Sequence, residues 1–402
     1  MSDHSHTPEP ANEQFDAGKA KSLSVLFGGG GIAAFVIALL LGLLMEGNTK
    51  QFAFSWLFGL VYVFTIACGA LFWVLVHHAT DAEWSVAVRR LLENMASVFP
   101  LLGVLFFAGI FFFAPLLFGW WDLPPGADSI LDKKRAYLNQ NGIFLRAALY
   151  FVALGTVAFL IRRNSVKQDE DGNPVYTVKN RKLAFIGIPA LGLSLTFAAV
   201  DWLMSLDWHW FSTMWGVYIF AGGVGGAMGL LVLLVTWLKS NGYLKIVTIE
   251  HYHIMGKLML AFCVFWAYIG YSQYMLIWYA NMPEETIYFI RRNTETWWYL
   301  SIILVVGRFF LPFPLLLFQA TKKNPKVLCG VAAWLLIMQA LDLYLVILPI
   351  LHVEGFSPSL LDLFCFVGFV GVAIGFFFWK LPKTNLYPAR DPRILESIRL
   401  SN

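Results

Sequence analysis

The side chains of this sequence that could do chemistry are His, Asp, Glu, Lys and Arg residues placed in or beside long apolar runs. Imidazole and carboxylate groups interleaved in this way are what a proton relay needs, because His changes charge near neutral pH and burial raises the pKa of a carboxylate toward that range. The first such cluster comprises His77, His78, Asp81, Glu83 and Glu93. The second opens a later apolar run and comprises Glu250, His251, His253 and Lys257.

Residues 201–210 read Asp-Trp-Leu-Met-Ser-Leu-Asp-Trp-His-Trp and form the most distinctive stretch of the chain. Asp201 lies inside the predicted end of an apolar helix, and Asp207 and His209 follow it, so we expect a stack of three titratable groups. The tryptophans of the same stretch suit the aromatic belt at a membrane interface.

Two further charged groups, Arg308 and Asp342, lie within apolar runs. A charge inside a spanning helix costs about 2.5–3.5 kcal/mol on insertion scales, so each one indicates either a function or a specific partner. An ion pair between Arg308 and Asp342 would ease both burials, and this structural interpretation stays open beside the functional one. The interfacial clusters have an equally plain interpretation as a belt of solvated polar residues.

The elements that must position these groups are transmembrane helices. Of the 402 residues, 58% are hydrophobic and only 13% are charged, which excludes a water-soluble domain. Lipid offers the backbone no hydrogen-bond partner, and the apolar runs are too long and too continuous for barrel strands. We therefore predict an all-α polytopic membrane protein with ten transmembrane helices. The spans are 24–45, 53–77, 97–120, 143–162, 183–204, 213–238, 254–280, 298–320, 327–350 and 358–380.

The distribution of Lys and Arg predicts the orientation of these helices. Most of the 29 cations fall in the N-terminal segment, the C-terminal segment and every second loop, and such cations stay on the cytoplasmic side. Both termini are therefore expected in the cytoplasm. Residues 1–23 are polar and contain two prolines, and we predict that they form a disordered cytoplasmic tail. Residues 381–402 are predicted to form a second cytoplasmic tail.

An ordered set of landmarks indicates an internal repeat. Glu93 and Glu250 each open the second helix of a four-helix unit. The fourth helix of each unit carries an Asp followed by a His, which are Asp201 and His209 in one copy and Asp342 and His352 in the other. Because four helices return the chain to the same side, the two units share one orientation. The predicted bundles span 53–212 and 213–357, with flanking helices at 24–52 and 358–380.

Several common sites are disfavoured by the sequence. The four cysteines are isolated, without a CxxC or CxxCH motif, so we expect no iron–sulfur cluster and no c-type haem in this chain. The glycine-rich runs at 28–31 and 221–229 lack the Lys-Ser/Thr of a phosphate loop and are typical of close helix packing. The histidines lie at wet helix ends beside carboxylates, which disfavours a bis-His haem b site.

With its repeat and its Asp-Trp-Leu-Met-Ser-Leu-Asp-Trp-His-Trp stretch, the chain from roughly residue 24 to 380 resembles the NrfD/polysulfide-reductase family of membrane subunits. It is most similar to the second NrfD-like subunit of bacterial alternative complex III, a quinol:cytochrome c oxidoreductase. The resemblance implies a place in the bacterial inner membrane and no cofactor in this chain. It implies that quinol, iron–sulfur clusters and haem c are held by partner subunits, namely another NrfD-like subunit, a periplasmic iron–sulfur protein and haem c subunits, with cytochrome c or an oxidase as the electron acceptor. The residues of this chain that match the family's motifs are Asp201, Asp207 and His209 at the outer end and the segment 250–253 at the inner end.

Three functions remain open from the sequence. The first is a proton-conducting subunit coupled to quinol oxidation, with path residues Glu93, Asp201, Asp207, His209, Glu250, His251, His253, Lys257, Arg308, Asp342 and His352. The second is a quinol site at the outer face, where Asp201 or His209 acts as general base. The third is a secondary transporter, which the paired repeats suggest but which lacks matched Gly/Pro breaks in its two halves.

Overall fold

The computed structural model describes residues 12–44 and 47–401, and within these ranges it is helical with no strand. Ten helical spans are long and apolar enough to cross a membrane, which confirms the predicted all-α polytopic fold. They are formed by α1 (Ala17–Leu44), α2 (Asn48–Ala79), η1 (Glu83–Ser85) with α3 (Val86–Ala96) and α4 (Phe99–Leu117), α6 (Gln140–Asp171), α7 (Val175–Trp202) with η2 (Met204–Asp207), α8 (Trp215–Ser240), α9 (Ile249–Ala280), α11 (Glu295–Val305) with η3 (Val306–Phe310) and α12 (Pro312–Leu317), α14 (Pro325–Ile347) with η4 (Leu348–Ile350), and α15 (Leu360–Lys380) with η5 (Leu381–Lys383).

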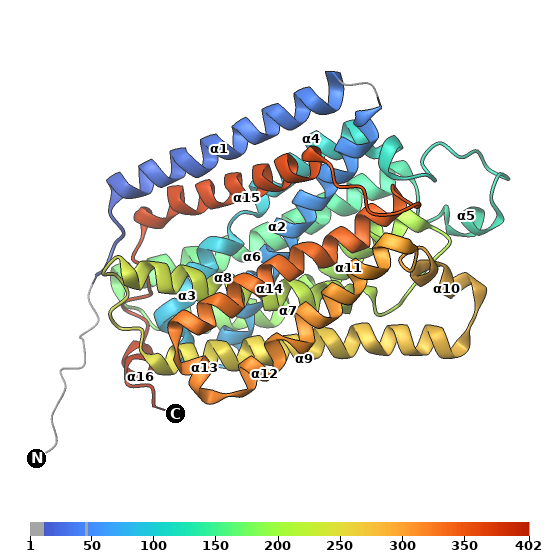
Figure 1. Cartoon of the computed structure of the whole chain (residues 1–402). Helices are drawn as coiled ribbons and strands as arrows, with labels where there is room; N and C mark the ends of the chain where they lie inside the picture. Colours follow the sequence, from blue (N-terminus) through green and yellow to red (C-terminus); the bar gives the residue numbers. More distant parts are fainter. Residues whose placement is uncertain (1–11, 45–46, 402) are drawn as a thin grey trace, which may run out of the picture.

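Short helices lie in the connections between spans, namely α5 (Ser129–Lys134), α10 (Pro283–Ile290) and α13 (Gln319–Lys323), and α16 (Ile394–Ile398) lies in the C-terminal segment. Helices α5 and α10 lie at one end of the bundle, and α13 and α16 lie at the other (Figure 1). We call the end with α16 and residues 12–16 the inner end, and the end with α5 and α10 the outer end.

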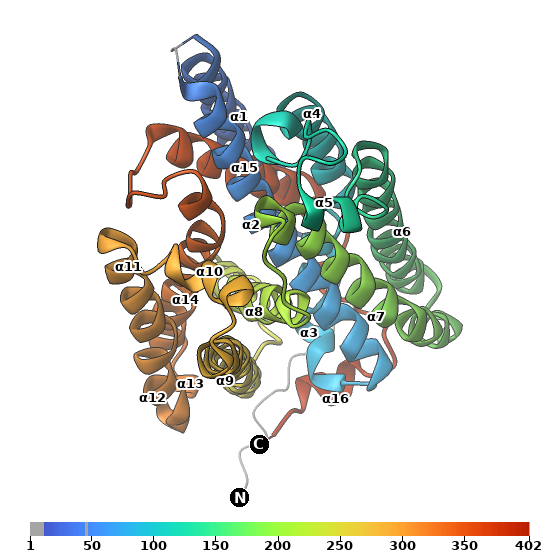
Figure 2. The same cartoon turned by 90° about the vertical axis from the view of Figure 1, so that its right-hand side faces the viewer.

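Helices α2 and α8 form the centre of the molecule. Helices α6 and α7 lie on one side of this centre, and α9, α11 and α12 lie on the other (Figure 2). The paired helices α1 and α15 run together along the periphery (Figure 1). The central position explains why α2 is almost wholly buried although its sequence is as apolar as that of the peripheral helices, whose outer faces would meet lipid.

Glycines allow the closest helix contacts. A Cβ atom added to Gly69 on α2 would lie 2.3 Å from the carbonyl oxygen of Gly223 on α8. Similarly, a Cβ added to Gly31 on α1 would lie 2.6 Å from the amide nitrogen of Val372 on α15. The interpretation of the two glycine runs as helix-packing segments is confirmed at Gly31 and Gly223.

Both terminal segments pack onto the inner end instead of extending away from it. The carbonyl oxygen of Glu13 accepts a 2.8 Å hydrogen bond from the amide of Leu386, and α1 begins at Ala17. The predicted disordered tail is therefore wrong over residues 12–23, because α1 extends beyond its apolar part and these contacts order the chain before it. Residues 1–11 lie outside the described part of the chain.

The eighth span contains an irregular segment that matters for the site. Within η3 the backbone forms a π-helix, and Pro312 follows it. The wider turn exposes the carbonyl oxygen of Gly307, which accepts a 2.6 Å hydrogen bond from Trp334, and that of Arg308, which accepts one from the Cys263 thiol at 3.2 Å. These contacts fix the part of the helix that carries the Arg308 side chain.

Candidate functional site

Arg308 and Asp342 form an ion pair in the second bundle, as predicted. One guanidinium nitrogen lies 2.5 Å from the Asp342 carboxylate, and both side chains are buried. The carboxylate also accepts hydrogen bonds from the Tyr218 hydroxyl and, at 3.1 Å, from the Trp266 indole. The guanidinium carbon lies 4.3 Å from the centre of the Trp266 ring, and Arg308 donates to Gln339. Every member of this cluster is thus held by at least one directed contact.

The first bundle contains a corresponding pair. Arg146 on α6 donates from two nitrogens to the two carboxylate oxygens of Asp201 on α7, at 2.8 and 2.9 Å. The Tyr150 hydroxyl donates to the same carboxylate at 2.7 Å. Both bundles therefore place an Arg from their third span beside an Asp from their fourth, with a tyrosine hydroxyl on the carboxylate. The sequence shows Arg146 within an apolar run but does not indicate which carboxylate it faces.

The predicted stack of Asp201, Asp207 and His209 is wrong, because each group has a different partner. Asp207 pairs with Arg291 at 2.5 Å, and His209 lies 2.6 Å from Asp128. The chain leaves the helical register after α7 and enters η2, which turns the three side chains in different directions.

Asp128 is a functional candidate that the sequence did not reveal. It caps α5, and its carboxylate accepts hydrogen bonds from the amides of Leu131 and Ile130, both at 2.9 Å, and from the Trp208 indole at 3.1 Å. These donors, with the Leu131 amide foremost, hold the pKa of Asp128 below its usual range. An ionised carboxylate 2.6 Å from a His209 ring nitrogen orients the imidazole.

A cavity of about 510 Å³ lies at this outer end. Its lining includes Asp207, His209 and Arg291 together with Lys50 and a set of apolar side chains. Asp201 is fully buried and does not line it. Of the two bases considered from the sequence, only His209 is therefore accessible to a molecule bound there.

His352, the fourth predicted outer residue, belongs to a separate buried network. Its Nε2 lies 2.6 Å from the side-chain oxygen of Gln51, whose amide nitrogen donates to Asp362 at 2.7 Å. Asp362 also accepts from the Ser55 hydroxyl at 2.6 Å and the Tyr344 hydroxyl at 2.9 Å. Burial lowers the pKa of His352 and favours its neutral form. The sequence did not indicate this role of Asp362, because an Asp three residues after Ser359 is expected in a helix-capping box. The structure contains that capping box.

At the inner end of the first bundle, Glu93 lies in a buried charge cluster. Arg90 reaches Glu93 at 3.0 Å and Asp169 at 2.9 Å, while Arg89 reaches Asp391 at 2.5 Å. Burial alone would raise the pKa of Asp391, but the guanidiniums of Arg89 and Arg393 outweigh it and hold the pKa below its usual range. The sequence could not assign Asp391 to this cluster, because nothing in the C-terminal segment indicates that it folds back onto the bundle.

His77 and His78 face this cluster from α2 and are fully enclosed. No ring nitrogen of either histidine has a hydrogen-bond partner within the described residues. Buried polar atoms of this kind require water or a transient partner, so the cluster is suited to accept a solvent molecule. Asp81, which the sequence placed with it, instead pairs with Arg181 and Arg393 at the surface.

The second bundle has its own inner group. Glu250 pairs with Lys323 at 2.7 Å and lies 3.6 Å from His253. Lys257, one turn further along α9, is within electrostatic range of His253. His251 points away from this group: its Nδ1 accepts from the Thr248 amide at 3.0 Å, and its Nε2 lies 3.4 Å from the Ser397 hydroxyl. The prediction that His251 and His253 occupy different helix faces is confirmed.

An aromatic layer separates the inner and outer groups of the first bundle. The Trp202 ring lies 4.9 Å from Phe64, 4.6 Å from Phe106 and 5.8 Å from Phe151, measured between centroids. These rings are buried and carry no proton acceptor. The polar groups of the first bundle thus form two separate sets, one toward each end, with an aromatic layer between them.

Neither a scan against protein-family models nor a search of curated proteins finds a match for this chain. Among the described residues, no group of three or more His, Cys, Asp and Glu side chains is arranged to hold a metal ion. The geometry of the charged clusters is therefore the main basis for a functional proposal.

Proposed function

We propose that this chain is a membrane subunit of a respiratory quinol-oxidising complex, of the alternative complex III type, and that its two bundles supply proton half-paths coupled to that oxidation. The single observation that carries the proposal is the repeated arrangement of Arg146, Asp201 and Tyr150 in one bundle and Arg308, Asp342 and Tyr218 in the other. Such charges are expensive at membrane depth, and their repetition favours a shared task over two unrelated ion pairs. The type of complex in this proposal is taken from the resemblance of the sequence to NrfD-like subunits.

In this proposal the inner groups, Glu93 in one bundle and Glu250 with His253 in the other, exchange protons with the inner aqueous phase. Asp201, beyond the aromatic layer of the first bundle, and Asp342 in the second bundle are the proton-accepting groups. Protonation of either carboxylate weakens its attraction to the paired Arg, which frees the guanidinium to move. Oxidation of quinol on a partner subunit would drive this change through a shift in helix packing or local charge.

The test neutralises one complete pair. In the double variant Arg308→Gln/Asp342→Asn, both charges are removed with little change in side-chain volume, so no unpaired charge is left in the interior. We expect the intact complex, reconstituted in liposomes, to keep quinol oxidation while proton movement per quinol falls to the amount released by the chemistry itself. The exposed pair Arg135 and Asp132, changed in the same way, is the matched control. Unchanged stoichiometry at normal assembly would contradict the proposal.

A second candidate function is a quinol site in the outer cavity, favoured by the His209 and Asp128 dyad. A base oriented by a carboxylate, beside a cavity of about 510 Å³ with mixed lining, is the arrangement that proton abstraction from a quinol requires. A photoreactive quinone analogue should then label residues near His209 and lose that labelling in His209→Phe. Labelling confined to partner subunits would remove this candidate.

A further inference from the structure

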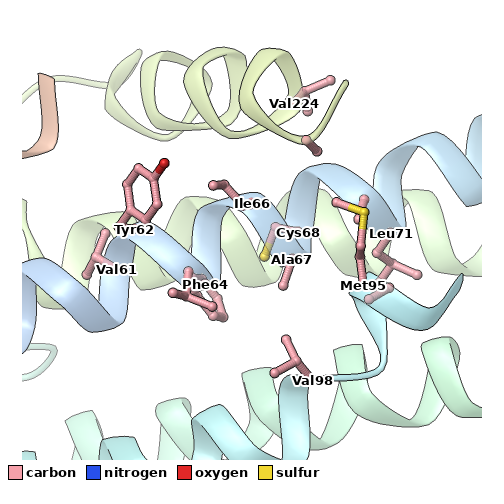
Figure 3. Close-up of a cluster of buried hydrophobic side chains, with 14 of the residues drawn as sticks. Val61, Tyr62, Phe64, Ile66, Ala67, Cys68, Leu71, Met95, Val98 and Val224 are labelled. Carbon is pink, nitrogen blue, oxygen red and sulfur yellow. The ribbon is translucent and has the colours of Figure 1, made fainter. Parts of the chain in front are cut away.

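A second cavity, of about 320 Å³, lies in the inner half of the bundle and belongs to neither set of proton-path groups. One wall is formed by α1 and α15, the opposite wall by the inner half of α8, and the floor by α2. Figure 3 shows Met95 on α3, and Val98 between α3 and α4, pointing toward α2, and both line the cavity together with Ala67 of α2. At its inner end, Trp237 and Phe378 pack at 5.4 Å between ring centroids and help to close it.

The cavity is apolar except at one point. Among the described residues that line it, Asn94 is the only amide, and none is charged. Asn94 is 1% exposed, and its side-chain oxygen accepts a 2.8 Å hydrogen bond from Arg162. Its amide nitrogen has no hydrogen-bond partner among residues 12–44 and 47–401. A void this large and this apolar does not hold ordered water, and leaving it empty forfeits packing contacts over its whole surface. The cavity thus suits an apolar chain that carries one hydrogen-bond acceptor.

Cations converge beside the Asn94 end. Lys380 and Lys383, at the inner end of α15, both interact electrostatically with Arg162. Lys380 lies 5.1 Å above the ring of Phe376, which lines the cavity, and Lys383 lies 3.0 Å above Trp379. Neither lysine has an acidic partner within ion-pair distance in the described chain, although Glu93 acts on Arg162. Such a group of cations at a helix end, next to an apolar cleft, attracts an anionic phosphate.

We propose that this cavity is a binding site for an anionic phospholipid. One acyl chain fills the space between α2, α8 and α15, the ester carbonyl accepts a hydrogen bond from the Asn94 amide, and the phosphate lies among Arg162, Lys380 and Lys383. The charge complementarity selects an anionic lipid over a zwitterionic one, and the bilayer surrounding the helices supplies it. The site does not depend on the proton-path proposal, because it uses none of those residues as ligands.

The experiment measures lipid binding by native mass spectrometry of the full-length chain in mild detergent, titrated with phosphatidylglycerol or phosphatidylcholine of matched acyl chains. We expect tighter binding of the first phosphatidylglycerol molecule. The charge variant Lys380→Ala/Lys383→Ala should weaken that binding about 30-fold, since each cation near a membrane surface contributes about 1 kcal/mol toward anionic lipid. The matched control Lys179→Ala/Lys182→Ala removes the same charge from the exposed inner part of α7 and should change it little.

A second variant tests the cavity itself. Ala67→Leu projects a larger side chain into the space and should weaken binding of both lipids, whereas the charge variant affects only phosphatidylglycerol. A phosphatidylglycerol carrying a diazirine on its acyl chain should label peptides around Met95, Val98 or Trp237. Equal affinity for the two lipids in the unmodified chain, or binding insensitive to both variants, would overturn the proposal. So would an isoprenoid quinone that displaces the bound lipid and is retained in its place.

Discussion

Arg146 and Arg308 are each stabilised within the helical bundle by the same kind of partners. In each case the guanidinium donates to an aspartate, and a tyrosine hydroxyl donates to the same carboxylate. Each carboxylate is thus surrounded by charged and neutral hydrogen-bond donors that take the place of water. The pair is therefore stable as long as both charges are present, and it becomes unstable when either one is removed or neutralised.

This leads to a prediction about stability. Arg146→Gln leaves the fully buried Asp201 with no cationic partner, so we expect a loss of about 3 kcal/mol, the lower end of the range for broken buried pairs, because the arginine is partly exposed. The control Arg135→Gln breaks a half-exposed pair at the same end and should cost less than about 1 kcal/mol. Detergent-titrated unfolding in mixed micelles would measure both. If the two variants lose equal stability, Asp201 does not depend on Arg146.

The Arg308 and Asp342 pair could be predicted from the sequence because both residues interrupt long apolar runs, and two opposite charges in lipid must find each other. The partners of Asp207 and His209 could not be predicted in this way. Arg291 and Asp128 lie in connecting segments, where charge is ordinary and no helical period indicates direction.

At the scale of helices, the two bundles are related but unequal. Helix α6 is continuous from Gln140 to Asp171, whereas the corresponding span changes from α11 through the π-helical η3 to α12. Arg146 lies about two turns into its span and Arg308 nearly four, about 3.6 residues making one turn. The paired charges of the second bundle are therefore deeper. A break in only one of the two halves also differs from the matched interruptions of secondary transporters.

The contact between α2 and α8 holds the two bundles together and gives a second prediction. Gly69→Ala places a Cβ within 2.3 Å of a backbone oxygen on α8, so the helices must separate. We expect a loss of about 1–3 kcal/mol. Gly192→Ala, with open space around its added Cβ, should be neutral or stabilise the helix by up to about 1 kcal/mol. Thermal unfolding of the two variants in the same detergent separates the effects; a Gly69→Ala protein as stable as the Gly192→Ala protein would argue against close contact.

Hydropathy was sufficient to predict all ten spans, because the length of an apolar run is set by the bilayer and not by tertiary contacts. It could not predict the π-helix, because a π-helical turn differs from an α-helical one in its hydrogen-bond pattern and not in the hydropathy of its residues. Nor could it predict that α1 begins at Ala17, because hydropathy does not show whether the polar residues before an apolar run are helical.

At the scale of the whole molecule, the polar groups of the first bundle lie toward its two ends with aromatic rings between them, whereas the Arg308 and Asp342 pair of the second bundle lies deeper. The C-terminal segment joins the bundles at the inner end, where Ser397 lies 3.4 Å from His251 of one bundle and donates to the carbonyl of Trp84 in the other at 3.0 Å. Titratable groups at both ends of the bundle are what the proposed proton half-paths require.

The most direct test of this account is purification of the affinity-tagged full-length chain from its native membrane in a mild detergent, followed by identification of what stays bound. The account predicts that haem c and iron–sulfur proteins co-purify, visible as a reduced haem c absorption band and an iron–sulfur paramagnetic resonance signal, together with quinol-dependent reduction of cytochrome c. A chain that elutes without redox partners and moves a solute by itself in liposomes would contradict it.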